Sequence, residues 1–230
     1  MAEIKQPERR TENPEVVERS RDFWSQYSRP IIIGALAVVL VVGGVWAYQS
    51  LVQKPKELKA ADAISKAEDY YRMDSLQVAL NGDGVNPGFL KVISTYGGTK
   101  AANLAHFYAG NIYLNLGDNA KAAKHLDEFE TDSKPVQARA YKLLADAYAG
   151  QGKNKEALDN YKKAAHHFPE DEQSASEYLF MAAYFADRVM KNQKEAIDLF
   201  KELKEKYSRT QFGYEADKYL AQLGVYSDKK

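Results

Sequence analysis

The sequence predicts an all-α protein: a single transmembrane helix, followed by an α-solenoid of helical hairpins that ends in a C-terminal capping helix. Three observations carry this prediction. Residues 31–52 contain no charged side chain and are rich in Val, Ile and Gly. From residue 57 onward, apolar residues recur at the i, i+3, i+4 and i+7 spacing of amphipathic helices. Within that region, the pattern of residues 103–129 returns 35 positions later, in residues 138–164.

The uncharged run 31–52 predicts a membrane span. About 20 apolar residues in a helix cross the hydrocarbon core of a bilayer, and a buried helix of a soluble core is rarely so long and so apolar. A cleaved signal peptide is disfavoured, because residues 1–30 precede the run with as many acidic as basic side chains, and no small-residue cleavage pattern follows. We therefore expect an uncleaved anchor that contacts the lipid bilayer.

The N-terminal tail, residues 1–30, is predicted to contain a short amphipathic helix. Asn13-Pro14-Glu15 is a typical helix start, with a capping side chain, a proline in the first turn and an acid near the positive end of the dipole. The alternative is a tail that is helical only part of the time, because so short a helix is marginal without its membrane contact. Aromatic side chains on both sides of the span are predicted to lie at the membrane interface: Phe23, Trp24, Tyr27, Trp46 and Tyr48.

The charges around the span leave its orientation open. Arg19, Arg21 and Arg29 lie before the run, and Lys54 and Lys56 lie after it. Because basic residues flank both ends, the positive-inside rule does not select one topology.

The repeats show the residue types that two packed helices need. Small residues let the helices of a hairpin approach closely, and a glycine between them takes a left-handed conformation at little cost. A third copy, residues 177–203, departs from the pattern, because Tyr184 stands at the small position and Lys191 at the glycine position. The matching residues are Gly110, Tyr113, Gly117 and Ala122 in the first copy, Tyr141, Leu144, Ala145, Tyr148, Gly152, Ala157, Tyr161, Ala164 and Pro169 in the second, and Ala196, Phe200 and Leu203 in the third.

This pattern, with a period near 34, resembles the tetratricopeptide repeat. The layout of tail, span and repeats is similar to that of bacterial inner-membrane tetratricopeptide repeat proteins, including the family of the ancillary Sec translocon subunit, and the sequence resembles Bacteroidetes-type members in style. The resemblance implies a single-pass protein of the inner membrane, with its N-terminus in the cytoplasm and its repeats in the periplasm.

The region after the span divides into three parts. Residues 57–100 are predicted to form a degenerate leading hairpin, with a long helix over 57–80 and a short one over 89–96. Residues 103–211 hold the three repeats. Residues 212–224 form the capping helix that a solenoid needs, since its last repeat would otherwise expose an apolar face.

Partner binding in a solenoid usually takes place in the concave groove lined by the first helix of each repeat. A groove with apolar ends and a charged middle suits an extended or helical peptide of a protein partner. The alternative is that helix 57–80 or the capping helix occupies the groove. The predicted groove residues are Leu104, Phe107, Asn111, Leu114, Arg139, Lys142, Asp146, Tyr178, Met181, Phe185 and Arg188.

Composition and motifs point away from catalysis. The 32 basic and 32 acidic residues balance, so counterion release gives no drive toward nucleic acid. The chain has no cysteine, which excludes disulfides, thiol catalysis and cysteine-bound metals. It contains no catalytic or nucleotide-binding motif, and its four histidines lack metal-ligand spacing. We predict no catalytic residue, no metal, no cofactor and no nucleic-acid partner.

The sequence therefore predicts a non-enzymatic, membrane-anchored scaffold that binds a protein partner or an emerging polypeptide at the periplasmic face of the inner membrane, with a link to the Sec translocon implied by the resemblance. Two alternatives stay open. An accessory of an envelope glycan or peptidoglycan enzyme is disfavoured, because both tryptophans belong to the membrane region. A structural homo-oligomer has one small-xxx-small step, Gly43 and Ala47, in its favour.

Overall fold

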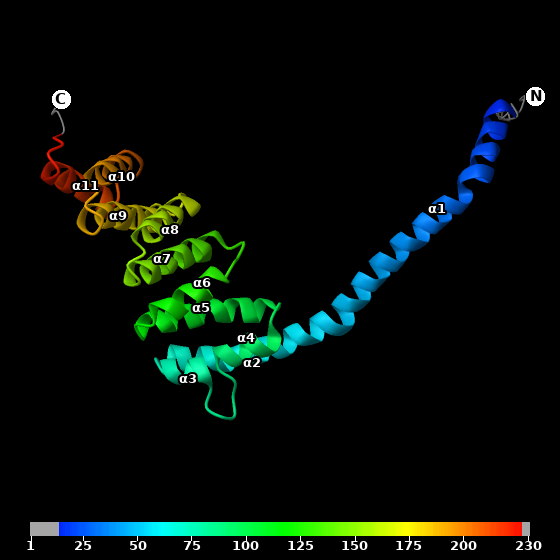
Figure 1. Cartoon of the computed structure of the whole chain (residues 1–230), viewed down its shortest axis with the longest axis horizontal. Coiled ribbons are helices and arrows are strands. Elements are labelled where there is room, and N and C mark those ends of the chain that lie inside the picture. Colours follow the sequence, from blue (N-terminus) through cyan, green and yellow to red (C-terminus); the bar gives the residue numbers. More distant parts are fainter. Residues whose placement is uncertain (1–13, 227–230) are drawn as a thin grey trace, which may run out of the picture. The chain divides into compact units, whose positions relative to one another are not determined.

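The computed structural model describes residues 14–226, and these are almost entirely helical, with no strand among them (Figure 1). The all-α prediction is therefore confirmed. The contacts divide the chain into two compact units, Met1–Pro55 and Lys56–Lys230. The elements in chain order are α1 (Pro14–Tyr48), the π-helical turn η1 (Gln49–Gln53), α2 (Lys54–Arg72), α3 (Leu76–Asn81), α4 (Phe89–Tyr96), α5 (Lys100–Asn115), α6 (Asn119–Asp127), α7 (Lys134–Gly150), α8 (Asn154–His167), α9 (Glu172–Arg188), α10 (Gln193–Lys206) and α11 (Gln211–Gln222).

The first unit is dominated by α1, which contains most of the apolar run. The helix continues through Pro30, so the tail helix and the span are one element rather than two. It ends at Tyr48, and the last residues of the predicted span form the turn η1. The apolar part is long enough to cross a membrane by length and composition, and none of it is buried. The predicted cap Asn13, with the rest of residues 1–13, lies outside the described residues.

The second unit is a stack of helical hairpins, α5–α6, α7–α8 and α9–α10, preceded by α2 to α4 and followed by α11 (Figure 1). The prediction of one long helix over 57–80 is wrong. The chain turns between α2 and α3, where Asp74 adopts a left-handed conformation with φ of 57°. Acidic residues tolerate this conformation better than most, but the change of direction at Asp74 gave no glycine or proline signal in the sequence.

The hairpins are held in register by their turns and their helix starts. Gly117 and Gly152 have φ of 78° and 72°, and Lys191, which replaces glycine in the third hairpin, has φ of 56°. The next helix often begins with a capping side chain, such as Asp118, which accepts from the Lys121 N–H at 3.1 Å. These local signals define where each helix of the stack begins.

The core is made mainly of alanine, leucine and aromatic side chains, in two clusters that both include residues of α7. Ala122, Ala157 and Ala196, which face the first helix of their own hairpins, are completely buried. Gly110 gives the closest approach between α5 and α6: a Cβ atom added there would lie 2.5 Å from Leu126 Cγ. The small residues of the repeat thus set how closely the two helices pack.

We expect Gly110→Ala to destabilise the repeat unit by about 1–3 kcal/mol, because the added methyl overlaps Leu126 and the core has to shift. Chemical denaturation of the full chain in detergent measures this cost. Gly97→Ala is the matched control, since its Cβ would make only an ordinary contact, 3.5 Å from Ile93 O. The double variant Gly110→Ala/Leu126→Ala should lose less stability than the sum of the two single changes, and simple additivity would contradict the packing account.

Candidate interaction surface

In the first hairpin, the predicted groove residues are largely covered by other parts of the protein. Phe107 and Asn111 are only 8% and 9% exposed. The ring of Phe107 packs against Phe129, with centroids 5.2 Å apart, and Asn111 Nδ2 donates to the hydroxyl of Tyr71 on α2 at 2.9 Å. Leu104 and Leu114 are half-buried against the same core. The leading helix α2 therefore contributes to this end of the groove, as the self-occupied alternative anticipated.

In the second hairpin, the predicted residues do form a polar cluster. Lys142 Nζ donates to Asp146 Oδ2 at 2.8 Å, and Tyr161 from α8 donates its hydroxyl to Asp146 Oδ1 at 2.6 Å. Burial, and then the charge of Asp146, raise the pKa of Tyr161 far above its ordinary value, so Tyr161 stays a donor. Arg139 lies on the same helix and is exposed. Arg139 thus exposes a positive charge on α7 beside this cluster.

In the third hairpin, the register of the first helix, α9, differs by one residue from the alignment of the three repeats. In the first two hairpins the cap N–H bonds five residues back, from Asp118 to Tyr113 O and from Lys153 to Tyr148 O. In the third, Asn192 N reaches six residues back, to Ala186 O at 2.9 Å. The extra residue is accommodated at the end of α9, so the helix before it is shifted by one position against the alignment.

This shift corrects the predicted groove residues of α9. The small position belongs to Ala183, which is completely buried, and not to Tyr184, which is 43% exposed. Phe185 points to the preceding hairpin, with its ring 5.6 Å from that of Tyr161, and is only 8% exposed. Tyr178 and Met181 are likewise half-buried against the core. The positions equivalent to the four predicted groove residues of α5 are Glu177, Phe180, Tyr184 and Asp187.

The groove of the third hairpin is partly covered by α11. Phe180 packs against Phe212 and Tyr219 of that helix, with centroids 5.2 Å away in both pairs. Tyr184 stacks on Phe180 and meets the edge of Tyr219. Arg188 places its guanidinium 5.9 Å from the Tyr184 ring centroid. These contacts form an aromatic platform of Phe180, Tyr184, Phe212 and Tyr219. The sequence did not reveal this platform, because Phe212 and Tyr219 belong to the capping helix α11.

Arg188 is fixed in place on this platform. Its Nε lies 2.9 Å from Asp187 Oδ2, and one terminal nitrogen donates to Gln222 Oε1 at 3.0 Å. Tyr184 and Arg188 are nevertheless exposed, and Arg139 is exposed on the neighbouring first helix, α7. Among the predicted groove residues, the structure therefore leaves the α7 and α9 part most accessible and closes much of the α5 part.

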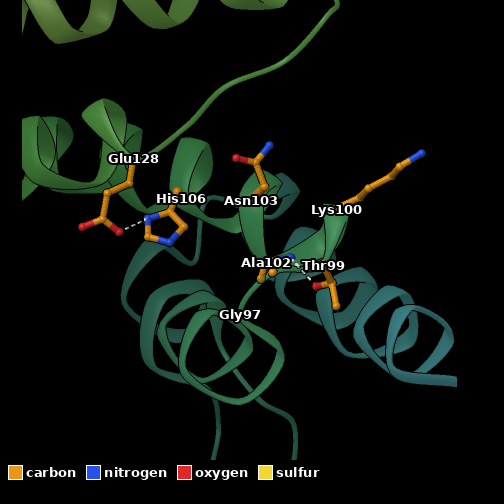
Figure 2. Close-up of a pocket in the computed structure, with 8 residues that line it drawn as sticks. Gly97, Thr99, Lys100, Ala102, Asn103, His106 and Glu128 are labelled. Atoms are coloured by element: carbon orange, nitrogen blue, oxygen red, sulfur yellow. Dashed lines mark hydrogen bonds and ion pairs between the residues drawn. The ribbon is translucent and has the colours of Figure 1, made fainter. Parts of the chain in front are cut away.

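A separate pocket of about 370 Å³ opens beside the start of α5 (Figure 2). His106 and Glu128 line it, and Figure 2 shows the Glu128 carboxylate directed at the His106 ring, with Oε2 3.4 Å from Nδ1. Burial lowers the pKa of His106 below its ordinary value of 6.5, and the charge of Glu128 opposes this shift. Within residues 14–226, no three His, Asp or Glu side chains are grouped so that they would hold a metal ion.

The aromatic residues assigned to the membrane interface all lie on α1 and are exposed. Phe23 and Tyr27 are one helical turn apart, with ring centroids 5.0 Å from each other. The exposed fractions of the set are 55% for Phe23, 56% for Trp24, 44% for Tyr27, 69% for Trp46 and 60% for Tyr48.

Two family models match the chain. One, described as a tetratricopeptide repeat-like domain, covers residues 21–140, which is more than half of the chain. The other, described as a tetratricopeptide repeat, covers residues 177–210. The first match begins inside α1, so the pattern of that family includes the apolar run as well as the leading helices. No curated protein matches the chain.

We expect Phe107→Ala and Phe185→Ala to destabilise the repeat unit by about 3–5 kcal/mol each, because both rings are buried in the core. Tyr184→Ala is the surface counterpart and should change the free energy of unfolding by about 1 kcal/mol or less. Chemical denaturation of the full chain in detergent compares the three variants. Equal losses for Tyr184→Ala and Phe185→Ala would contradict the shifted register of α9.

Proposed function

We propose that this chain, which belongs to the tetratricopeptide repeat-like family, is a single-pass, membrane-anchored scaffold that binds protein partners and carries out no catalysis itself. Repeats of this kind typically serve as protein-interaction modules, because stacked hairpins create an extended concave surface. The observation that supports the anchored form most directly is α1, because no residue of its apolar part is buried. In water, so large an apolar surface would be strongly unfavourable.

The aromatic residues of α1 support a particular placement in the bilayer. At 1.5 Å per residue, the helix from Tyr27 to Trp46 is about 30 Å long, which is about the thickness of the hydrocarbon core. In this placement Phe23, Trp24 and Tyr27 lie at one interface, and Trp46 and Tyr48 lie at the other. The turn η1 then follows the far interface, outside the hydrocarbon region.

We further propose the location and the class of partner. The resemblance in layout to bacterial inner-membrane repeat proteins supports a cytoplasmic N-terminus and periplasmic repeats. There the repeats would bind an emerging polypeptide or a subunit of the Sec translocon. A tether raises the effective concentration of the repeats beside membrane machinery, so that weak contacts are sufficient.

The binding surface that we propose is the accessible part of the groove on α7 and α9. Tyrosine and arginine are the residue types that most often dominate interface energetics. Tyr184 is held between Phe180, Tyr219 and the guanidinium of Arg188, so little side-chain entropy is left to lose on binding. Arg139 adds a positive charge on the neighbouring helix. This surface suits a peptide segment that offers apolar and acidic side chains.

Photocrosslinking in native membranes tests the proposed surface. A photoreactive residue in place of Tyr184 should capture a translocon subunit or a nascent envelope protein. The same residue in place of Tyr214, an exposed tyrosine outside the proposed surface, is the control. Adding Arg139→Ala should reduce the capture several-fold, since a rim charge is lost. Equal capture at both positions, or capture of this chain alone, would refute the proposed partner class.

Topology is tested with single cysteines, which is direct because the natural chain has none. We expect a membrane-impermeant maleimide to label Asp132→Cys, in the loop before α7, once the outer membrane is made permeable. It should label Gln6→Cys only after the inner membrane is opened as well. The reverse pattern would place the repeats in the cytoplasm and remove the proposed periplasmic partners.

A further inference from the structure

Two histidines meet between the helices of the first hairpin. His106 on α5 and His125 on α6 point their Nδ1 atoms at each other, 3.1 Å apart, and both rings are half-buried. Tyr113 of α5 also stacks on the His125 ring, with centroids 5.5 Å apart and planes inclined by 10°. The imidazole pair is thus a direct polar contact between α5 and α6.

The neighbouring carboxylate identifies the donor of this contact. A neutral imidazole carries one proton, so one Nδ1 has to donate and the other has to accept. Glu128 Oε2 lies 3.4 Å from Nδ1 of His106, and a carboxylate only accepts. The geometry therefore assigns the shared proton to Nδ1 of His106, leaving Nδ1 of His125 as the acceptor and placing the proton of His125 on Nε2.

We propose that this pair is a proton-operated switch, which holds α5 and α6 together while His125 is neutral and loosens the hairpin when His125 takes up a proton. A first proton can enter at Nε2 of His106 without breaking the contact, because Nδ1 of His106 already carries a hydrogen. A second proton has to occupy Nδ1 of His125. Two N–H groups, each on a cationic ring, would then face each other at 3.1 Å.

The surrounding charges separate these two steps. Glu128 favours the charged form of both rings, and Lys124 on α6 disfavours it. Lys100 lines the pocket that opens beside His106, and Lys121 lies over the Tyr113 ring that stacks on His125. Burial lowers the pKa of His125, and the neighbouring His106 lowers it further. The pair therefore titrates in two coupled steps, both of them more acidic than an exposed histidine.

The sign of the pH dependence follows from these shifts. Because the folded pKa values lie below the ordinary 6.5, the neutral pair contributes its full stabilisation above about pH 6.5. This contribution is lost as the pH falls below that value. Acidification should therefore loosen the first hairpin first, and alkaline conditions should leave it unchanged.

The switch would also make partner binding sensitive to pH, and this consequence rests on the proposed function. Helix α5 carries Asn111, which ties the groove to Tyr71 of α2 at 2.9 Å. A change in how α5 packs on α6 would disturb that bond and the groove beside it. Acid would then weaken the capture of a partner without any change in the binding residues of α7 and α9.

The first test observes the protons directly. The full chain in lipid nanodiscs is labelled with ¹⁵N at its four histidines and titrated from pH 8 to pH 5 by NMR. At pH 8 we expect His106 to carry its proton on Nδ1 and His125 on Nε2, and the pKa of His125 to lie below its ordinary value of 6.5. Two independent rings, both protonated on Nε2 and titrating near 6.5, would overturn the proposal.

The second test follows the hairpin. Hydrogen exchange of the full chain, corrected for intrinsic rates, should show that protection in α5 and α6 falls about tenfold or more between pH 7.5 and pH 5.5. His125→Phe keeps the ring stacked on Tyr113 but cannot take up a proton, and it should reduce this pH effect to the smaller part that His106 contributes alone. Glu128→Gln retains both histidines but removes the charge that favours their protonated forms, so it should increase the loss of protection at pH 5.5. His167→Gln, at the end of α8, is the control that should behave as the natural chain does.

The outcomes separate the switch from the proposed function. A loss of protection spread evenly over all helices, or one that is undiminished in His125→Phe, refutes the switch. If His125→Phe fails to fold, the larger acid loss expected in Glu128→Gln decides by itself. If the switch operates but crosslinking at Tyr184 captures no partner at any pH, the proposed function fails and the switch stands.

Discussion

The close approach of two helices within each hairpin is the constraint on which the rest of the repeat unit depends. It requires a residue with little or no side chain at one position of the first helix: Gly110, Ala145 and Ala183. Because a Cβ on Gly110 would already collide with Leu126, the hairpin angle cannot change without repacking its core. The packing of each first helix on its second helix is thereby fixed, which positions the side chains of the proposed groove.

Local patterns determine most of this arrangement, which is why the sequence predicted the hairpins, their turns and the apolar helix α1. Two features could not be predicted from the sequence. The extra residue at the end of α9 was hidden, because Lys191 keeps the turn aligned while the helix before it shifts. The cover over the groove comes from Tyr71, Gln222 and Phe212, which are distant in sequence from the residues they contact. Periodicity gives the direction of a side chain on its helix but not the element that meets it.

The two units distribute their apolar residues in different ways. In the repeat unit, alanine and leucine alternate with charged residues, so each helix has one face for the core and one for water. In α1, Val, Ile and Leu surround the helix, and residues such as Leu40 and Trp46 are 75% and 69% exposed. A helix that is apolar on all sides has no stable place in water unless another phase covers it. The same hydrophobic effect that folds the second unit leaves α1 with an uncovered apolar surface, which the proposed membrane anchor would cover.

Polar contacts between neighbouring hairpins add a further constraint on the groove. On the second helices, Lys162 pairs with Glu195 at 2.7 Å and His166 with Glu202 at 2.8 Å. On the first helices, Arg188 bonds to Gln222 of α11. Contacts on both sides of the stack oppose a change of angle more effectively than contacts on one side. Since each exposed pair contributes little free energy, their effect lies in geometry rather than in stability. A rigid surface loses less entropy when it binds, so the proposed contacts at Tyr184 and Arg139 would contribute more to affinity than on a flexible one.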